Sequence, residues 1–310
     1  MNKTTLLVNG CSMCYGSELF EDSTTKLCID NQARLAASWS GLLGKQLGFE
    51  RVVNLGYPGG SNDRILRTTM AWILNWLTCH SPRNTLCVII GWSGPMRREF
   101  YINDEWRQLI PYHDYADASA ALLNRAYREI AWSEYESAIR FSTQLLSLQS
   151  FLQQHKIPYL FFDAITSFAQ INEDSGYALN SYLPHILKQF YFNFNMAKGD
   201  MASQLHTIHE AKHTHPNQSG HLAWAQKLAT YINDEKLFPV LSPTTDIIYE
   251  GTGTIEIYDK KIGLPPVSPQ KNNFARLDAM NEIASTQTNK SKNIWLKLKK
   301  AFSRDPFIYE

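Results

Sequence analysis

Four short apolar runs within the first 165 residues constrain most strongly how this chain can fold. They are TTLLVN (4–9), RVVNLG (51–56), TLCVIIG (85–91) and IPYLFFDAI (157–165). Runs of this length that are apolar almost throughout are typical of strands covered on both faces. Stretches with helical periodicity alternate with them, at 33–47, 61–78, about 119–155 and 215–233. The alternation predicts an α/β fold with three layers, α/β/α, around a central parallel sheet.

The chain has 310 residues, 44% of them hydrophobic, which is enough for one large α/β domain with an appendage. We predict this domain over residues 1–238. After it, TDIIYEGTGTIEIYD (245–259) alternates around a Gly-Thr-Gly turn as a β-hairpin does. Residues 289–304 place apolar side chains on one helical face and lysines over the rest, which predicts a basic amphipathic helix. Residues 239–310 are therefore expected to form a C-terminal extension.

Charge restricts the partners of the protein. Thirty Lys and Arg against 29 Asp and Glu give a formal net charge of +1, so we expect no nucleic-acid partner. The basic helix at 289–304 is the local exception. It could dock on a membrane surface or a partner protein, or pack on its own domain or on a second copy in a homo-oligomer.

Cysteine usage and the N-terminus indicate the compartment. The five cysteines are odd in number and scattered in spacing, which favours a reducing environment. The apolar run at 4–9 is too short for a signal peptide, and no run approaches the roughly 18 apolar residues of a membrane-spanning helix. We expect a cytoplasmic protein.

The stretch LLVNGCSMCYGSEL (6–19) contains a C-x-x-C pair, Cys11 and Cys14. A redox pair of this kind needs its first cysteine at the start of a helix, and Gly16 follows too soon for that helix to continue. A zinc site would need two further ligands, which only His213 and His215 could supply. We therefore interpret the cysteines as packing residues and expect neither a metal nor a cofactor.

The same stretch also suits a serine nucleophile. An apolar strand leads into a glycine-bearing turn that would expose the hydroxyl of Ser12 at the carboxyl end of the sheet, where open α/β sheets place their sites. Such a serine needs a base and oxyanion donors from elsewhere in the chain.

Four blocks in order, NGCSMCYG, NLGYPGGSND, IIGWSGP and HPNQSGHLAWA, resemble the SGNH/GDSL hydrolase superfamily over roughly residues 4–235. The resemblance implies a flavodoxin-like sheet and a serine esterase without a cofactor. It makes Ser12 the nucleophile and His215 the general base. It makes the backbone N–H of Gly59, with Gly60 as the alternative, and the hydroxyl of Ser93 oxyanion donors.

The sequence departs from the family at two carboxylates and one amide. The usual aspartate beside the serine is Cys11, and the aspartate three residues before the histidine is Lys212. Ser93 itself stands where the family carries asparagine. Three residues remain candidates for the partner that orients the histidine: Glu210, His213 and Asp163.

The segment GPMRREFYINDEW (94–106) after the third block carries arginines and aromatics that suit a polar ligand. Candidate substrate-binding residues are Asn62, Arg97 and Glu99. We expect hydrolysis of a small polar acylated molecule, with a carbohydrate O-acetyl ester among the candidates. The alternative is a catalytically weakened module of the same fold that binds a glycan or nucleotide-like ligand or serves in an assembly.

Overall fold

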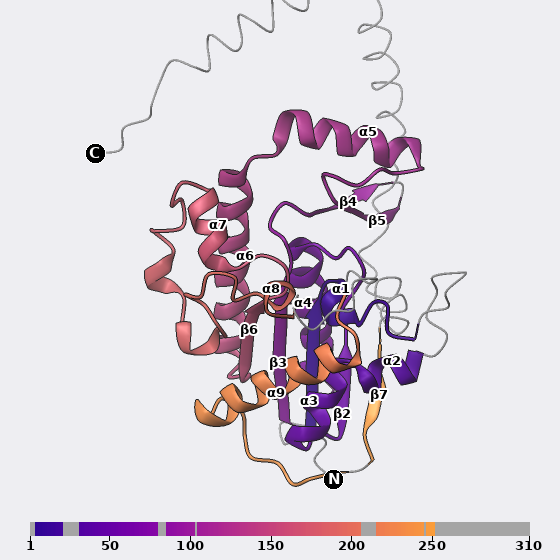
Figure 1. Ribbon diagram of the computed structural model, residues 1–310, viewed down its shortest axis with the longest axis vertical. Helices are drawn as coiled ribbons and strands as arrows, with labels where there is room; N and C mark the ends of the chain where they lie inside the picture. Colours follow the sequence, from indigo (N-terminus) through magenta and orange to yellow (C-terminus); the bar gives the residue numbers. More distant parts are fainter. Residues whose placement is uncertain are drawn as a thin grey trace, which may run out of the picture. The chain divides into compact units, whose positions relative to one another are not determined.

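A parallel five-stranded sheet forms the centre of the computed structural model, which describes residues 4–20, 31–79, 85–102, 104–205, 215–244 and 246–251 (Figure 1). The strand order is β6-β3-β1-β2-β7, and each neighbouring pair is parallel. The predicted parallel sheet is therefore confirmed. The strands are β1 (Thr4–Gly10), β2 (Arg51–Asn54), β3 (Thr85–Trp92), β6 (Tyr159–Asp163) and β7 (Ile248–Glu250).

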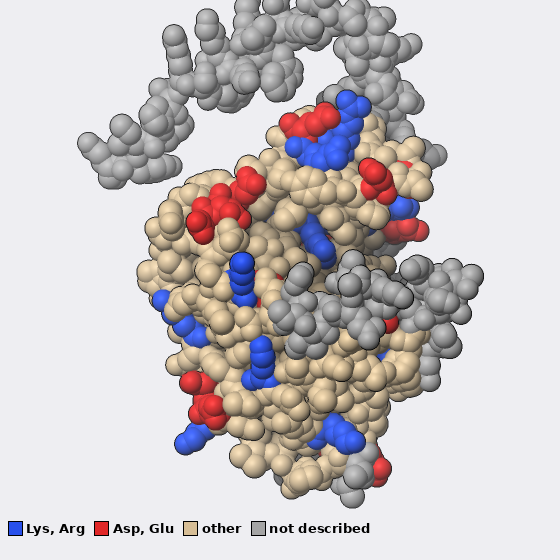
Figure 2. All heavy atoms as spheres, viewed as in Figure 1, with Lys and Arg blue, Asp and Glu red and all other residues tan. Residues whose placement is uncertain are grey.

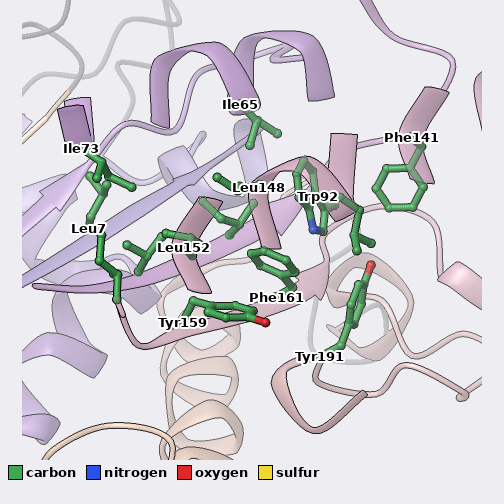
Figure 3. Packing of buried hydrophobic residues seen from close by; sticks show 14 of the residues in the cluster. Leu7, Ile65, Ile73, Trp92, Phe141, Leu148, Leu152, Tyr159, Phe161 and Tyr191 are labelled. Atoms are coloured by element: carbon green, nitrogen blue, oxygen red, sulfur yellow. The ribbon is translucent and has the colours of Figure 1, made fainter. Parts of the chain in front are cut away.

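Alternate side chains of each central strand enter two different apolar clusters. In β1, Leu7 faces one cluster, whereas Leu6 and Val8 face the other. The cluster around Leu7 also contains Trp92 and Phe161, whose rings meet edge to face with centroids 5.5 Å apart (Figure 3). Burial on both faces explains why the strands read as continuous apolar runs.

Helices cover both faces of the sheet and complete the three layers. On the side of Leu7 lie α4 (Asn62–Cys79), α6 (Glu134–Gln154) and α7 (Phe168–Asp174). On the opposite side lie α3 (Trp39–Leu47), α8 (Met201–Leu205) and α9 (Gln218–Asp234). The imidazole Nδ1 of His221 in α9 accepts a hydrogen bond of 3.1 Å from the backbone N–H of Trp39, which joins α9 to the start of α3.

Two predicted helices are interrupted. The helix expected at 33–47 is divided at Ser38, whose extended backbone separates α2 (Asn31–Ala37) from α3 and whose hydroxyl caps α3. The helix expected at 119–155 consists of α5 (Ala118–Ala126), a π-helical turn η1 (Tyr127–Ala131) and α6. Trp132 and Ser133 are extended between η1 and α6, and the Ser133 hydroxyl accepts from the N–H of Glu136 at 3.0 Å. Apolar periodicity continues across such caps, so it does not reveal them.

Residues 94–133, which we call the cap, lie between β3 and α6 and sit above the carboxyl ends of the strands in Figure 1. The sequence analysis assigned no strand to its first part. The structure has an antiparallel hairpin there, β4 (Arg98–Ile102) with β5 (Glu105–Leu109), followed by α5 and η1. Two single-turn 3-10 helices, η2 (Leu183–His185) and η3 (Lys188–Phe190), lie between α7 and α8.

The carboxylate of Asp63 at the start of α4 holds the cap to the helical layer. Its Oδ1 accepts from the side-chain amide of Gln144 at 2.6 Å and from Arg140 at 3.3 Å. Its Oδ2 accepts from the backbone N–H of Glu99 in β4 at 2.9 Å. One partly buried acid thus joins α4, α6 and the hairpin.

The chain continues past the predicted domain end at residue 238 along the sheet. Strand β7 pairs with β2, and the carboxylate of Glu250 receives two hydrogen bonds from Arg51, at 2.7 and 2.8 Å. This strand is the first half of the predicted hairpin. The second half and the basic helix at 289–304 lie outside the described residues. Among the helices that are described, none is long and apolar enough to cross a membrane.

The ends of β1 and β3 meet beneath the short helix α1 (Ser12–Tyr15). Gly10 pairs with Gly91, and the sulfur of Cys14 in α1 lies over both glycines. A Cβ added at Gly10 would lie 2.3 Å from that sulfur, and one added at Gly91 would lie 2.4 Å from it. Neither glycine can carry a side chain while α1 stays in place.

We therefore expect Gly91→Ala to lower the free energy of unfolding by about 1–3 kcal/mol, because the new methyl overpacks the site. Chemical denaturation measures this. Gly94→Ala is the matched control, since its Cβ would approach only the Met96 side chain, at 3.9 Å. Equal stability of the two variants would contradict this account of the strand ends.

Candidate active site

Ser12 is the first residue of α1, directly after β1 and the extended residue Cys11. It is 8% exposed. The helix lasts one turn because Gly16 adopts φ 83° and donates its N–H to the Ser12 carbonyl at 3.1 Å. The local sequence thus places a hydroxyl at the start of a helix and at the carboxyl edge of the sheet, as predicted.

The turn after β2 packs directly against the Ser12 turn. The Tyr57 N–H donates to the Gly10 carbonyl at 3.1 Å, which ties the two turns together. The Gly60 N–H donates to the Tyr57 carbonyl at 2.9 Å, so it is already used within the turn. Gly59 has φ 76°, a conformation that favours glycine. Of the two candidate donors, Gly59 is the one whose N–H this turn does not use.

Ser93 follows β3 and is held by Asn62 at the start of α4. The Asn62 side chain accepts from the Ser93 N–H at 2.8 Å and donates to the Ser93 carbonyl at 3.0 Å. Asn62 was predicted to bind substrate, but it is fully buried and its side chain binds the backbone of Ser93 instead. The Ser93 hydroxyl is buried and has no hydrogen-bond partner within the described ranges. Asn62 is therefore placed to position Ser93.

His215 is bound to a carboxylate that the sequence analysis did not identify. Its Nδ1 lies 3.0 Å from Oε1 of Glu18, and its backbone N–H donates to Oε2 of Glu18 at 3.2 Å. Glu18 belongs to the turn that follows α1, six residues after Ser12, and has φ 68°. The pair therefore links the Ser12 turn to the segment before α9. The only sequence signal was an acid two residues after the first block.

Of the three predicted orienting residues, the structure describes one, Asp163. Glu210 and His213 lie outside the described residues, as does Lys212. Asp163 ends β6, where its carboxylate accepts from the Phe168 N–H at 2.7 Å and from the Tyr191 hydroxyl. Asp163 thus uses both oxygens to hold the loop after β6. Of the described residues, Glu18 is the one whose carboxylate meets the imidazole of His215.

Glu99 and Arg97 occupy different environments despite their proximity in sequence. The Glu99 carboxylate is 1% exposed and receives two hydrogen bonds from Arg67, at 2.8 and 2.9 Å. Gln108 donates a further bond to it at 2.6 Å. Glu99 is therefore a structural acid beneath the hairpin. Arg97 lies in the turn after β3 and keeps a partly exposed side chain.

An open pocket of about 490 Å³ lies at the carboxyl ends of β3 and β6. The cap supplies Tyr112 and Trp132, whose rings meet at 89° with centroids 5.6 Å apart. Thr166, three residues after β6, contributes from the sheet side. The remaining lining residues are Pro95, Met96, Glu134, Ser137, Ile171 and Asp174.

Cys11 and Cys14 are buried and not joined to each other. Burial raises the pKa of the Cys14 thiol well above its ordinary value, so the thiolate that redox chemistry needs is disfavoured. Among the residues that the structure describes, no group of three or more His, Cys, Asp and Glu side chains could hold a metal ion.

Surface charge offers no large basic field on the face shown in Figure 2. Lys and Arg side chains are scattered there, and the largest gathering, over the cap, includes acids as well. This distribution agrees with the balanced composition of the chain.

Comparisons with known proteins give one family match. A family of unknown function (DUF6071) matches residues 17–243, a range that begins after Ser12 and includes Glu18 and His215. No curated protein matches the sequence significantly.

Two solved structures are similar at low identity. An acetyl xylan esterase from Butyrivibrio proteoclasticus is 13% identical with a TM-score of 0.41, covering 77% of this chain. The chain spans 66% of the length of that esterase. A member of the lipolytic G-D-S-L family from Veillonella parvula is 12% identical with a TM-score of 0.34, covering 74% of this chain and 97% of its own.

The carboxyl group of Asp163 should make stability depend on pH. Burial raises its pKa to about 7, although hydrogen bonds from Tyr191 and Phe168 act in the opposite direction. An unfolded aspartate ionises near pH 4. The stabilising contribution is therefore complete below about pH 4 and is lost as the pH rises through 7. It amounts to a few kcal/mol, about 1.4 kcal/mol for each unit of pKa difference.

Asp163→Asn removes this titration, so its free energy of unfolding should vary less than that of the wild type between about pH 4 and 7. Urea denaturation at several pH values measures both proteins. Parallel stability curves for the two would show that Asp163 does not titrate in this range.

Proposed function

The chain belongs to the family of unknown function DUF6071, and we propose that it is a serine hydrolase that cleaves acyl esters. The observation that carries the proposal is the contact of 3.0 Å between Nδ1 of His215 and Oε1 of Glu18. A base in such a site needs a carboxylate that selects its tautomer and stabilises the imidazolium. Glu18 supplies this group from the turn that contains Ser12.

In the proposed reaction, the Ser12 hydroxyl oxygen attacks the acyl carbon of the ester while Nε2 of His215 takes the hydroxyl proton. The tetrahedral intermediate then collapses. The carbon–oxygen bond to the alcohol breaks, and His215 returns the proton to the leaving alkoxide. Water, deprotonated by the same nitrogen, then attacks the acyl carbon of the acyl-enzyme. The bond from this carbon to the Ser12 oxygen breaks, His215 returns the proton to that oxygen, and the carboxylic acid leaves.

Three donors are proposed for the oxyanion of the intermediate: the backbone N–H of Ser12, the backbone N–H of Gly59 and the hydroxyl of Ser93. A buried hydroxyl without a partner is costly, and this favours a role for Ser93 that begins only when substrate is present. Asn62 fixes the Ser93 backbone on both sides of the residue. This support suits the fixed geometry that an oxyanion donor needs.

Glu18 also accounts for the departure at Lys212. In the SGNH/GDSL pattern the carboxylate precedes the histidine by three residues, whereas here it would come from the turn just after the first block. The backbone N–H of His215 binds the second oxygen of Glu18, so the carboxylate holds both the ring and the main chain. The two contacts make the position of the ring less dependent on the residues before it.

The proposed substrate is a small polar acylated molecule, and a carbohydrate O-acetyl ester is the first class to assay. The pocket whose lining begins two residues past Ser93 supports this choice. Its lining combines the apolar Pro95 and Ile171 with the aromatic pair Tyr112 and Trp132. Such a lining suits the organic part of a ligand, while its acids can accept hydrogen bonds from hydroxyl groups.

The nucleophile is tested by covalent labelling. We expect a fluorophosphonate probe to label the wild-type chain and hydrolysis of 4-nitrophenyl acetate to be measurable. Ser12→Ala should lose both, because no other group takes over the attack. Ser147→Ala is the control, since this serine lies exposed on α6 and binds only the Thr143 carbonyl.

Retention of labelling by Ser12→Ala would remove Ser12 as the nucleophile. If the wild type is not labelled but a ligand raises its melting temperature, the alternative of a weakened binding module is favoured instead.

The role of Glu18 is tested by Glu18→Gln. We expect kcat to fall about 10²–10⁴-fold, because the amide no longer stabilises the imidazolium. Glu173→Gln, at an exposed acid on α7, is the control. An unchanged kcat in Glu18→Gln would contradict the assignment.

A further inference from the structure

Arg97 is held in a fixed place by its backbone. Its N–H donates to the Gly94 carbonyl at 3.2 Å, which closes the turn after β3. Its carbonyl accepts from the guanidinium of Arg140 at 3.4 Å. Arg140 in turn donates to the Pro95 carbonyl at 2.7 Å. The turn that carries Arg97 is therefore clamped from α6 and does not depend on the Arg97 side chain.

The guanidinium of Arg97 has a buried nitrogen without a hydrogen-bond acceptor in the described part of the chain. Its Nη1 is buried, and within the described part of the chain it has no hydrogen-bond partner and the guanidinium has no ion pair. A buried donor on a charged group is costly when it lacks an acceptor. This cost is expected where the missing acceptor belongs to a ligand.

The other arginines of the cap, and Arg67 and Arg140 in the helices next to it, differ from Arg97. Each of them contacts a carboxylate or a backbone carbonyl. The pairs are Arg67 with Glu99, Arg98 with Glu136, Arg107 with Glu105, Arg125 with Glu129, Arg128 with the Pro111 carbonyl, and Arg140 with Asp63. The nearby acids Glu99 and Asp63 are thus already neutralised by other residues. Arg97 keeps its positive charge available.

Arg97 lies four residues beyond Ser93, in the turn that follows the proposed oxyanion donor. Asn62 holds the Ser93 backbone through its N–H and its carbonyl. The next residue, Gly94, accepts the Arg97 N–H at 3.2 Å. The backbone therefore ties the position of Arg97 to that of Ser93.

We infer that Arg97 forms an anion subsite beside the proposed acyl site and binds a carboxylate or phosphate group of the ligand. The planar guanidinium fork matches both groups and offers two parallel hydrogen bonds to either of them. That the bound molecule is the substrate rests on the proposed function. That the subsite binds an anion rests on Arg97 alone.

Anion binding is tested on the full-length protein without any turnover. Succinate and inorganic phosphate serve as probes, with sodium chloride at matched ionic strength as the reference for screening. We expect at least one probe to raise the melting temperature in a saturable manner. Arg97→Met should weaken this binding about tenfold or more, because it removes the charge and keeps the length of the side chain.

Two further variants complete the experiment. Arg97→Lys keeps the charge but loses the fork, so its affinity should lie between those of the wild type and Arg97→Met. Arg125→Met is the matched control, since its exposed pair with Glu129 lies on the surface of the cap, and it should bind as the wild type does.

A response to succinate alone identifies a carboxylate ligand, and a response to phosphate alone identifies a phosphate. No response to either probe, or the same response in Arg97→Met as in the wild type, overturns the subsite. Anion binding that depends on Arg97 in a chain that fails to hydrolyse esters would leave the subsite in place and remove only the hydrolase proposal.

Discussion

The close approach of two strand ends determines where everything else at the carboxyl edge can lie. Gly10 and Gly91 are neighbours in the sheet, and the Cys14 sulfur sits in the space that two Cβ atoms would fill. The absence of side chains at the two glycines lets α1 pack directly on the strand ends. Ser12, the first residue of α1, therefore lies at the edge of the sheet. Cys14, which belongs to the C-x-x-C pair that suggested redox chemistry, serves here as a small apolar packing residue.

The turns after β1 and β2 are held together by hydrogen bonds to the backbone. The Gly10 carbonyl receives the Tyr57 N–H, and the Asn54 side chain donates to the Cys14 carbonyl at 2.8 Å. These bonds join the ends of β1 and β2 around α1. The glycines and asparagines of the first two blocks are thus explained by geometry, whether or not the site is catalytic.

A polar seam under the cap provides the second constraint. Asp63 accepts hydrogen bonds from α6 and from the hairpin, and Glu99 is buried in a bidentate pair with Arg67. A buried charge such as that of Glu99 contributes less to net stability than to a single defined arrangement, because it is costly unless its partner is present. The seam therefore fixes the cap over the strand ends and leaves Arg97 as the cap arginine without an acceptor in the described chain.

Prediction from sequence succeeded where one physical pattern dominates and failed where distant residues meet. Apolar runs such as 85–91 identified the central strands, since burial on both faces requires them to be apolar. Helix breaks at Ser38 and Ser133 escaped prediction, because a cap changes one hydroxyl and leaves the periodicity intact. The hairpin β4–β5 also escaped, since its charged residues Arg98 and Glu99 find ion-pair partners in α4 and α6.

The sequence by itself determined the parallel α/β layout and the position of Ser12 at the end of the first strand, because both follow from local patterns. Only the tertiary structure decided which carboxylate meets His215. Glu18 and His215 are 197 residues apart, and nothing local in either segment indicates the pairing. Tertiary packing likewise decided that Glu99 is enclosed and that Arg97 is not neutralised. Pairing of charges depends on three-dimensional distance, which a linear pattern does not record.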